Sequence, residues 1–330
     1  MQQGEKTELQ NEENNQFEYP QSIQQKEEEE KININNDMNN NIEYKSNNTY
    51  SNINTNQAPN LQFLQEFEEK LKSIGKYISE EDFQKIISEN EINYYQPNSP
   101  FPFINNNFSH KMKPIEFEGG NIYEGEWNEN FVMDGHGKYF LLEEKVLAEG
   151  IWEKGELKKA RIFYPNGEFY EGEMNNSCYN GKGKLINENK DIYEGEFLDG
   201  EKNGKGKINF FNGDIYEGDF SKNKFHGYGE LSLENGLKYK GNFFSNFLEG
   251  KGVLSFPPQE KYEGDFEKNL FHGKGVYTYS NGDEYDGGFE FGIRKGKGTY
   301  KQKNGITFEG NWEIMYRLLK LRRLMKPIME

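Results

Sequence analysis

The sequence predicts an all-β repeat array, an elongated single-layer stack of antiparallel β-hairpins, and three observations carry this prediction. An aromatic residue recurs with a constant period of 23 residues, a length typical of repeat architectures. Runs that alternate between apolar and polar residues follow each aromatic, as expected for short strands. Asn-Gly dipeptides, which favour hairpin turns, separate several of the units. The recurring aromatics are Tyr170, Tyr193, Tyr216, Tyr239, Tyr262, Tyr285 and Phe308.

Each unit contains two predicted strands. In residues 216–220, Tyr-Glu-Gly-Asp-Phe, the aromatics lie at even spacing with acidic residues between them, so one face is apolar and the other faces water. In the unit that begins at Tyr262, a second alternating run over residues 276–279 follows a Gly-x-Gly. The glycines supply positive φ at turns and leave room for neighbouring rings. Because a lone hairpin cannot bury its apolar face, we expect the units to stack.

The repeated motif resembles a known family. Residues 262–266, Tyr-Glu-Gly-Asp-Phe, precede a polar loop, a Gly-x-Gly and an Asn-Gly turn, and this pattern is similar to the MORN repeat (membrane occupation and recognition nexus). The resemblance covers roughly residues 115–312, and residues 115–120 resemble the second strand of a truncated first unit. It implies a protein similar to the MORN scaffolds of cilia and the cytoskeleton, such as radial spoke head proteins. The best-matching units begin at Tyr123, Tyr193, Tyr216 and Tyr262.

One unit departs from the pattern. Ala148 stands where the aromatic is expected, no Gly-x-Gly follows Trp152, and the spacing from Tyr123 exceeds the period by about two residues. We therefore expect a bulge or irregular packing in this unit.

The segments before the array differ from it in composition. Residues 1–60 are rich in Gln, Asn, Glu and Lys, which predicts a disordered tail. Residues 61–92 carry apolar residues at helical spacing and predict a helical pair, with Gly75 ending the first helix and Ser79 preceding the second. We expect this pair to dock on itself or on the first repeat. Residues 93–114 contain several prolines and predict a linker.

The chain after Trp312 has a helical period, and residues 313–326 predict an amphipathic helix. Its apolar stripe either covers the open edge of the last hairpin as a cap or meets anionic lipid or a calmodulin-like partner. The cap is the favoured hypothesis because the stripe begins immediately after the last strand. The residues that would contact lipid in the alternative are Arg317, Lys320, Arg322, Arg323 and Lys326.

Several features that imitate catalytic or cofactor sites have simpler explanations. Gly-Lys-Gly segments such as residues 181–183 look like phosphate cradles, but no helix pattern follows them. His136, His226 and His272 recur at one motif position and lack a second ligand at metal spacing. About 18 residues follow the last repeat, too few for a catalytic domain. We therefore predict no enzymatic activity, no cofactor and no metal, and we expect no nucleic-acid partner.

Composition predicts a cytoplasmic location, with the cytoskeleton or a cilium as the more specific hypothesis. A single cysteine, Cys178, allows no intramolecular disulfide and favours a reducing compartment. No apolar run approaches the roughly 18 residues of a membrane span. The N-terminus lacks the apolar core of a signal peptide.

The predicted function is that of a non-catalytic scaffold, which binds helical or extended segments of partner proteins along an aromatic-lined groove. Two alternatives are a peripheral tether to anionic phospholipid and, less favoured, a regulatory subunit of an enzyme supplied in trans. Residues 121–310 carry a net charge near −8, which an anionic leaflet would repel. The oligomeric state stays open. The residues predicted to form the repeat core and to line the candidate groove are Tyr123, Trp127, Tyr170, Tyr193, Phe197, Tyr216, Phe220, Tyr239, Phe243, Tyr262, Phe266, Tyr285, Phe289, Phe308 and Trp312.

Overall fold

The computed structural model describes residues 69–90 and 112–312, which all lie in the unit spanning Tyr50–Glu330. These residues build one antiparallel sheet of 19 strands. Residues 69–72 are helical, and α3 spans Glu80–Glu89. The strands are β1 (Gly75–Tyr77), β2 (Ile115–Phe117), β3 (Ile122–Trp127), β4 (Met133–Leu141), β5 (Val146–Glu153), β6 (Glu156–Phe163), β7 (Phe169–Asn175), β8 (Cys178–Ile186), β9 (Ile192–Leu198), β10 (Glu201–Asn209), β11 (Ile215–Ser221), β12 (Lys224–Ser232), β13 (Lys238–Phe244), β14 (Phe247–Phe256), β15 (Glu260–Glu267), β16 (Leu270–Thr278), β17 (Glu284–Glu290), β18 (Ile293–Lys301) and β19 (Thr307–Trp312).

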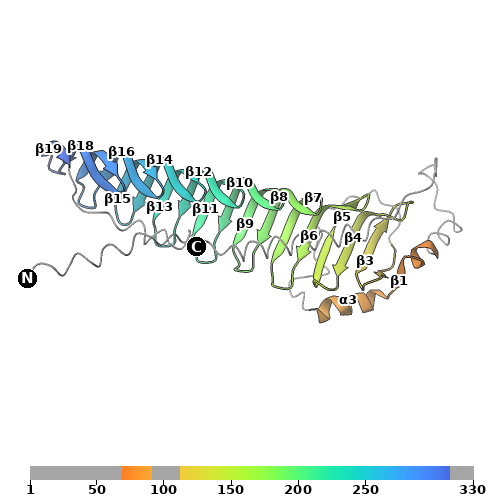
Figure 1. Ribbon diagram of the computed structural model, residues 1–330. Coiled ribbons are helices and arrows are strands. Elements are labelled where there is room, and N and C mark those ends of the chain that lie inside the picture. The colour runs from red at the N-terminus through yellow and green to blue at the C-terminus, as the bar shows by residue number, and fades with distance from the viewer. Residues whose placement is uncertain (1–68, 91–111, 313–330) are drawn as a thin grey trace, which may run out of the picture. The chain divides into compact units, whose positions relative to one another are not determined.

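Consecutive strands are neighbours throughout the sheet. Each strand from β1 to β18 pairs antiparallel with the strand that follows it in the chain. Figure 1 shows these strands side by side in chain order. Each odd-numbered strand from β3 to β17 forms a complete hairpin with the strand after it. Strand β19 is the first strand of one more unit, whose second strand does not follow within the described residues. The predicted all-β hairpin array is therefore confirmed.

The first unit takes its missing strand from an earlier part of the chain. Strand β2 is the predicted second strand of a truncated unit, and β1 pairs with it where a first strand would lie. The sequence did not predict this strand: residues 75–77, between the helical residues 69–72 and α3, are extended. Pairing with β1 covers the backbone edge that β2 would otherwise expose.

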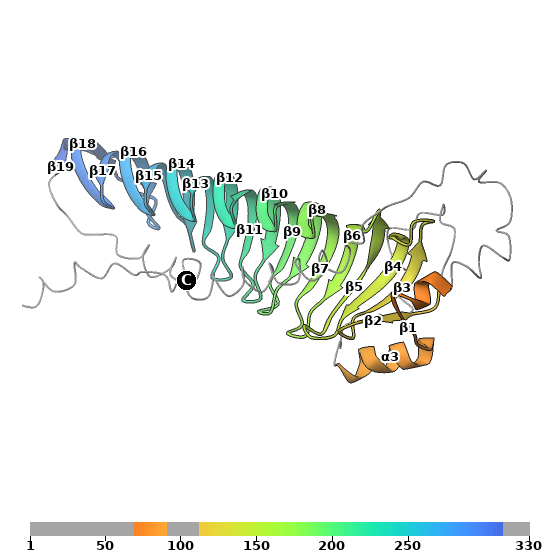
Figure 2. The ribbon, with the colours of Figure 1, turned by 45° about the vertical axis from the view of Figure 1, so that its right-hand side comes forward.

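Helix α3 docks on the first repeats, one of the two arrangements expected from the sequence. The hydroxyl oxygen of Ser79 accepts a hydrogen bond from the backbone N–H of Asp82 at 2.9 Å and so caps the helix. Phe83 and Ile87, which lie one helical turn apart, are buried in a cluster with side chains of the sheet. These partners are Ile122, Phe140, Leu147 and Phe163, one from each of the strands β3 to β6. Figure 2 shows α3 at this end of the sheet.

A bulge recurs in the hairpins. Gly218 lies opposite Gly229, but the next residue, Asp219, lies opposite His226, so two residues of β12 have no partner on β11. Such extra residues bend a strand and increase its twist. The same two-residue shift occurs in the hairpins β3–β4, β7–β8, β9–β10, β13–β14, β15–β16 and β17–β18.

The unit at Ala148 is irregular, as its sequence predicts. Its hairpin has a register shift of one residue instead of two, between Ile151 and Trp152. The room that a tyrosine ring takes in other units is filled differently, because Leu157 of β6 packs against Gly150. The irregularity is therefore a shorter bulge in which the Leu157 side chain takes the place of a tyrosine ring. The strands remain paired on both sides of it.

Some expectations from the sequence fall on residues outside the described part of the chain. These are the disordered tail 1–60, the start of the first predicted helix, most of the linker 93–114 and the C-terminal helix 313–326.

Candidate binding surface

The tyrosines that open the units form the centre of each repeat. The hydroxyl of Tyr216 donates a hydrogen bond to the backbone carbonyl oxygen of Asp219 at 2.8 Å. Its ring lies over Gly218 and Gly229, where an added Cβ would approach the hydroxyl to 2.6 Å. The two glycines are therefore required because the ring occupies the space of their side chains. Burial raises the pKa of Tyr216 above its ordinary value, and the nearby Asp219 carboxylate raises it further.

The aromatic rings form a ladder along the array that is continuous from Tyr170 to Trp312. It is broken before Tyr170, because Ala148 and Met174 stand where linking rings would lie, and Tyr123 and Trp127 belong to the separate part of the ladder before this break. The ring of Phe220 meets the ring of Tyr216 edge-on, with centroids 5.1 Å apart, and meets that of Tyr193 from the preceding unit at 5.0 Å. Phe225 stacks on Tyr216 at 3.8 Å, which closes the core over the tyrosine. Edge-on and offset contacts of this kind are the favoured geometries of aromatic pairs. Each phenylalanine therefore links two successive tyrosines.

The structure places the predicted core and groove residues in this ladder. Thirteen of them are at most 4% exposed: Tyr123, Trp127, Tyr170, Tyr193, Phe197, Tyr216, Phe220, Tyr239, Phe243, Tyr262, Phe266, Tyr285 and Phe289. Phe308 differs, because it stands on the last described strand and is 51% exposed. Trp312 is partly exposed, and its indole N–H donates to the carbonyl oxygen of Gly298 at 3.0 Å. The surface of the array is therefore made by the residues around the ladder.

The acidic residue before the second aromatic of a unit holds the bulge. The Oδ2 atom of Asp219 accepts at 3.0 Å from the backbone N–H of Tyr228, a bulge residue that has no partner on β11. Asp265 accepts from Lys274 in the equivalent way. Burial raises the pKa of Asp219, but the Lys205 ammonium at 2.6 Å and this N–H outweigh burial, so the net pKa is lowered. The strand pattern predicted only that these acids lie on the face toward water, and their role at the bulge was missed.

Asparagines in the hairpin turns join neighbouring units. In the turn between β13 and β14, Ser245 and Asn246 both have positive φ, the conformation of a type I′ turn. The side-chain oxygen of Asn246 accepts from the backbone N–H of Phe225, one unit earlier, at 2.7 Å. Asn223 and Asn269 make the same contact with Lys202 and Leu248. The sequence prediction described these turns only as polar loops, although their regularly spaced Asn residues were the available signal.

A row of charged side chains crosses successive strands of the sheet. On the first strand of most units the charged residue directly follows the tyrosine, as Glu171 follows Tyr170. The row alternates in sign through consecutive strands and ends where Glu217 lies opposite Glu230. The ammonium of Lys184 lies 2.8 Å from the carboxylate of Glu194, and both side chains are substantially exposed, as predicted for cross-strand pairs. Near α3, however, Glu124 and Glu149 are buried. The alternating part of the row consists of Glu124, Lys138, Glu149, Arg161, Glu171, Lys184, Glu194, Lys207 and Glu217.

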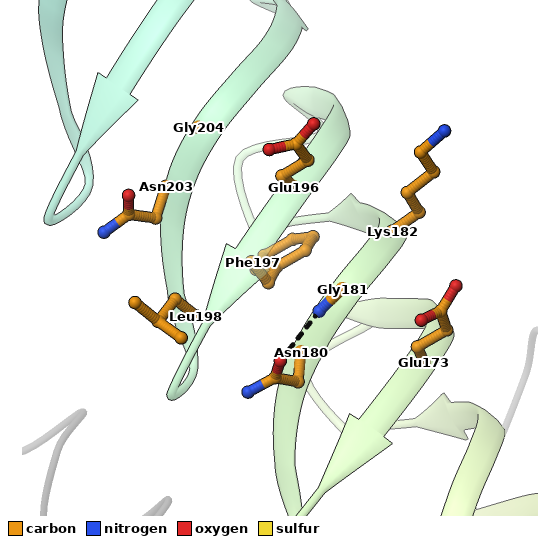
Figure 3. A pocket seen from close by; sticks show the side chains of 9 residues that line it. All are labelled: Glu173, Asn180, Gly181, Lys182, Glu196, Phe197, Leu198, Asn203 and Gly204. Carbon is orange, nitrogen blue, oxygen red and sulfur yellow. Dashed lines mark hydrogen bonds between the residues drawn. The ribbon is translucent and has the colours of Figure 1, made fainter.

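A shallow hollow of about 620 Å³ opens between β7 and β10 (Figure 3). Its carboxylates belong to Glu173 and Glu196, which lie against Gly181 and Gly204 at the bulges of β8 and β10. The side-chain oxygen of Asn180 accepts from the backbone N–H of Gly181 at 3.0 Å. The polar groups of the hollow are thus the bulge-forming groups of two adjacent units, with exposed Leu198 beside them.

Large apolar side chains are exposed at positions that vary between units. Phe244 and Phe291 are each more than half exposed, and their rings lie near those of His226 and His272, at 5.2 and 5.7 Å between centroids. The repeat core does not require these side chains, because equivalent positions in other units are polar, as at Ser221. These exposed apolar side chains are therefore features of particular units and not of the repeat itself.

Within residues 69–90 and 112–312, no group of three or more His, Cys, Asp and Glu side chains could hold a metal ion. The described helices include none with the length and apolar character that crossing a membrane demands.

Six segments of the chain match the family model of the MORN repeat: residues 123–140, 193–215, 216–238, 239–260, 262–284 and 285–307. The unmatched residues 141–192 include the irregular unit at Ala148. A search of curated proteins finds no match to this chain.

Three solved structures illustrate the matches that a structure comparison finds. The G-box domain of the microcephaly protein CPAP is 13% identical, with 61% of this chain and 99% of that chain covered and a TM-score of 0.33. The TCP10 domain of Danio rerio CPAP is 10% identical, with 61% and 90% covered and a TM-score of 0.30. The TCP10c domain of Drosophila melanogaster Sas-4 is 15% identical, with 47% and 93% covered and a TM-score of 0.29.

Proposed function

We propose that this chain, which carries six MORN repeats, is a non-catalytic scaffold that binds partner proteins along its array. The observation that supports the proposal is that the polar side chains that recur from unit to unit make hydrogen bonds within the array. Tyrosine hydroxyls, acidic side chains at the bulges and turn asparagines all bind backbone atoms of the array itself. The side chains that vary between units, such as Phe244 and Phe291, are those that face solvent. A repeat structure whose core is constant and whose surface side chains vary is suited to binding other macromolecules.

The proposed setting is a cytoskeletal assembly in the cytoplasm, with a cilium as the more specific form of this proposal. Because the rings predicted to line the groove are buried, a partner is proposed to meet the charged row and the exposed apolar side chains instead. A helical or extended segment suits this surface, since it can follow many units at once.

The second candidate function is a peripheral membrane tether. The observation that favours it is the cluster of five basic residues after the last described strand, Arg317, Lys320, Arg322, Arg323 and Lys326. Each such cation near an anionic leaflet is worth about 1 kcal/mol. The competing proposal for residues 313–326 is a cap on the array, because β19 ends there and Phe308 is half exposed.

Two measurements on the full chain test these functions against each other. The chain and a variant lacking residues 313–330 are sedimented with vesicles that contain or lack phosphatidylserine, and both are unfolded by heat. The scaffold with a cap requires that the full chain stays in the supernatant and that the deletion lowers the melting temperature. Sedimentation with phosphatidylserine vesicles that the deletion abolishes, at unchanged melting temperature, would instead establish the tether.

A further inference from the structure

The face of the sheet on which α3 docks carries a row of apolar side chains that runs beyond the helix. Cross-strand pairing places Phe163 opposite Phe169, Phe169 opposite Ile186, and Ile186 opposite Ile192. Side chains directly opposite each other in a sheet have Cβ atoms about 5 Å apart. The row is interrupted at Asn209 and resumes at Ile215.

Exposure along this row rises with distance from α3. Phe163 is buried in the cluster with Phe83 and Ile87, and Phe169 is partly buried against that cluster. Ile186 and Ile192 are partly exposed, and Ile215 is 37% exposed. In the turn between β10 and β11, Phe211 is 77% exposed, and its backbone N–H donates to the carboxylate of Asp191, the residue before Ile192, at 2.8 Å. We call Phe169, Ile186, Ile192, Phe211 and Ile215 the apolar ledge.

We propose that the apolar ledge binds an amphipathic helix of a partner protein, in continuation of the interface that α3 makes on the same row. This inference rests on the proposed scaffold function and names the partner class at one part of the array. The packing of α3 shows what the row accepts: two apolar side chains one turn apart, Phe83 and Ile87, cover residues of four successive strands. In Figures 1 and 2 the axis of α3 crosses the strand direction.

The dimensions of the ledge fit a helix. From β7 to β11 there are four strand spacings, or about 19 Å at 4.8 Å each, a length that about 13 helical residues cover. The ledge is one side chain wide, because the next position on each strand of this face belongs to the charged row with Glu171, Lys184 and Glu194. An apolar stripe on a helix matches such a narrow row.

The charged row also argues against a second copy of this chain as the occupant. If two of these sheets packed face to face on the ledge, they would take the pairs Lys184–Glu194 and Lys207–Glu217 out of water. The desolvation of charged pairs costs several kcal/mol per ion unless new partners replace water. A helix can cover the apolar row and leave the charged row in water.

The test uses a synthetic peptide with the sequence of residues 79–90 as the probe. A side-chain lactam between Glu81 and Lys85, both exposed in α3, holds the peptide helical. A peptide in which Phe83 and Ile87 are replaced by Asp is the control probe. Binding to the full chain is measured by fluorescence anisotropy and compared with three variants: Ile192→Asp and Ile215→Asp on the ledge, and Phe291→Asp at an exposed ring away from it.

The expected result is binding that weakens at least about tenfold in both ledge variants and is unchanged in Phe291→Asp. Ile215→Asp, at the more exposed position, keeps the test valid if Ile192→Asp lowers the melting temperature. Absence of binding, equal binding by all three variants, or equal binding of the control probe would overturn the inference. Dimerisation of the full chain that Ile215→Asp abolishes, in sedimentation equilibrium, would overturn it as well. Failure of the proposed scaffold function is recognised by a different result, namely that the full chain sediments with phosphatidylserine vesicles.

Discussion

The hydroxyl of Tyr216 donates to the carbonyl oxygen of Asp219, three residues along the same strand. The contact recurs in six other units, from Tyr123 with Glu126 to Tyr285 with Gly288. It lies at the point where the pairing register shifts, between Gly218 and Asp219. The phenol therefore binds a backbone carbonyl beside the bulge while its ring fills the core.

This contact predicts the effect of removing one hydroxyl. Tyr216→Phe should lower the free energy of unfolding by about 1 kcal/mol, because the carbonyl of Asp219 loses the hydrogen bond from the phenol. Tyr216→Ala should cost about 3–5 kcal/mol, because it also removes the ring. Urea unfolding of the full chain measures both values. Glu217→Gln, on the exposed face of the same strand, is the control and should cost under about 0.5 kcal/mol; equal losses at Tyr216 and Glu217 would mean that the faces are assigned wrongly.

The glycine pair under the ring gives a second prediction. Gly218→Ala should destabilise the array by about 1–3 kcal/mol, because its Cβ would lie 2.6 Å from the Tyr216 hydroxyl and force the ring out of position. Gly310 occupies the same repeat position on β19, but an added Cβ there meets no atom within 4 Å. Gly310→Ala should therefore have little effect or stabilise slightly. Thermal unfolding compares the two variants, and similar losses in both would show that backbone conformation, rather than the ring, requires the glycine.

The repeat and its strands could be predicted from the sequence because period and alternation report directly on them. Tyr216 and Phe220 are two positions apart on one strand, so their shared face follows from strand geometry alone. The irregular unit at Ala148 was also predictable, since a missing aromatic and a missing glycine both leave space to be refilled.

What could not be predicted depends on contacts between strands. The two-residue bulge leaves Tyr228 without a partner on β11. Its backbone N–H can therefore donate to Asp219, a contact that depends on the pairing register. In the same way, β1 takes the place of a missing strand by pairing with β2, which lies about 40 residues later in the chain. No local sequence pattern encodes this contact. The half-exposed Phe308 follows from its place on the last described strand, although its motif is the same as elsewhere.

The turn asparagines allow backbone conformation to be separated from hydrogen bonding. Asn246 has φ of 69° and accepts from the backbone N–H of Phe225. Asn246→Gly keeps the conformation but removes the acceptor, and Asn246→Asp keeps the acceptor. We expect Asn246→Asp to be close to wild type, Asn246→Gly to cost about 1 kcal/mol, and Asn246→Ala to cost about 1 kcal/mol more than Gly. Equal stability of the Gly variant and wild type, in urea unfolding, would show that the contact between units contributes nothing.

The raised pKa of the core tyrosines predicts how stability changes in alkali. The ordinary pKa of tyrosine is 10.0, and burial is the main cause that raises the pKa of Tyr216 above it, followed by the Asp219 charge. The folded state therefore holds the proton at a pH where the unfolded state has released it. The contribution of this group to stability is complete below pH 10, the unfolded value, and is lost as the pH rises toward the folded pKa.

A comparison of wild type with Tyr216→Phe isolates this effect, because all other titratable groups are the same in both chains. Below pH 10 wild type should be the more stable by about 1 kcal/mol. Above it, the advantage should shrink by about 1.4 kcal/mol per pH unit, so the two stabilities should meet within about one unit. The measurement is urea unfolding at a series of pH values, with phenolate absorbance recorded alongside circular dichroism. Phenolate absorbance from the core should rise with unfolding; a stability gap that stays constant through this pH range would show that Tyr216 ionises as readily in the array as in the unfolded chain.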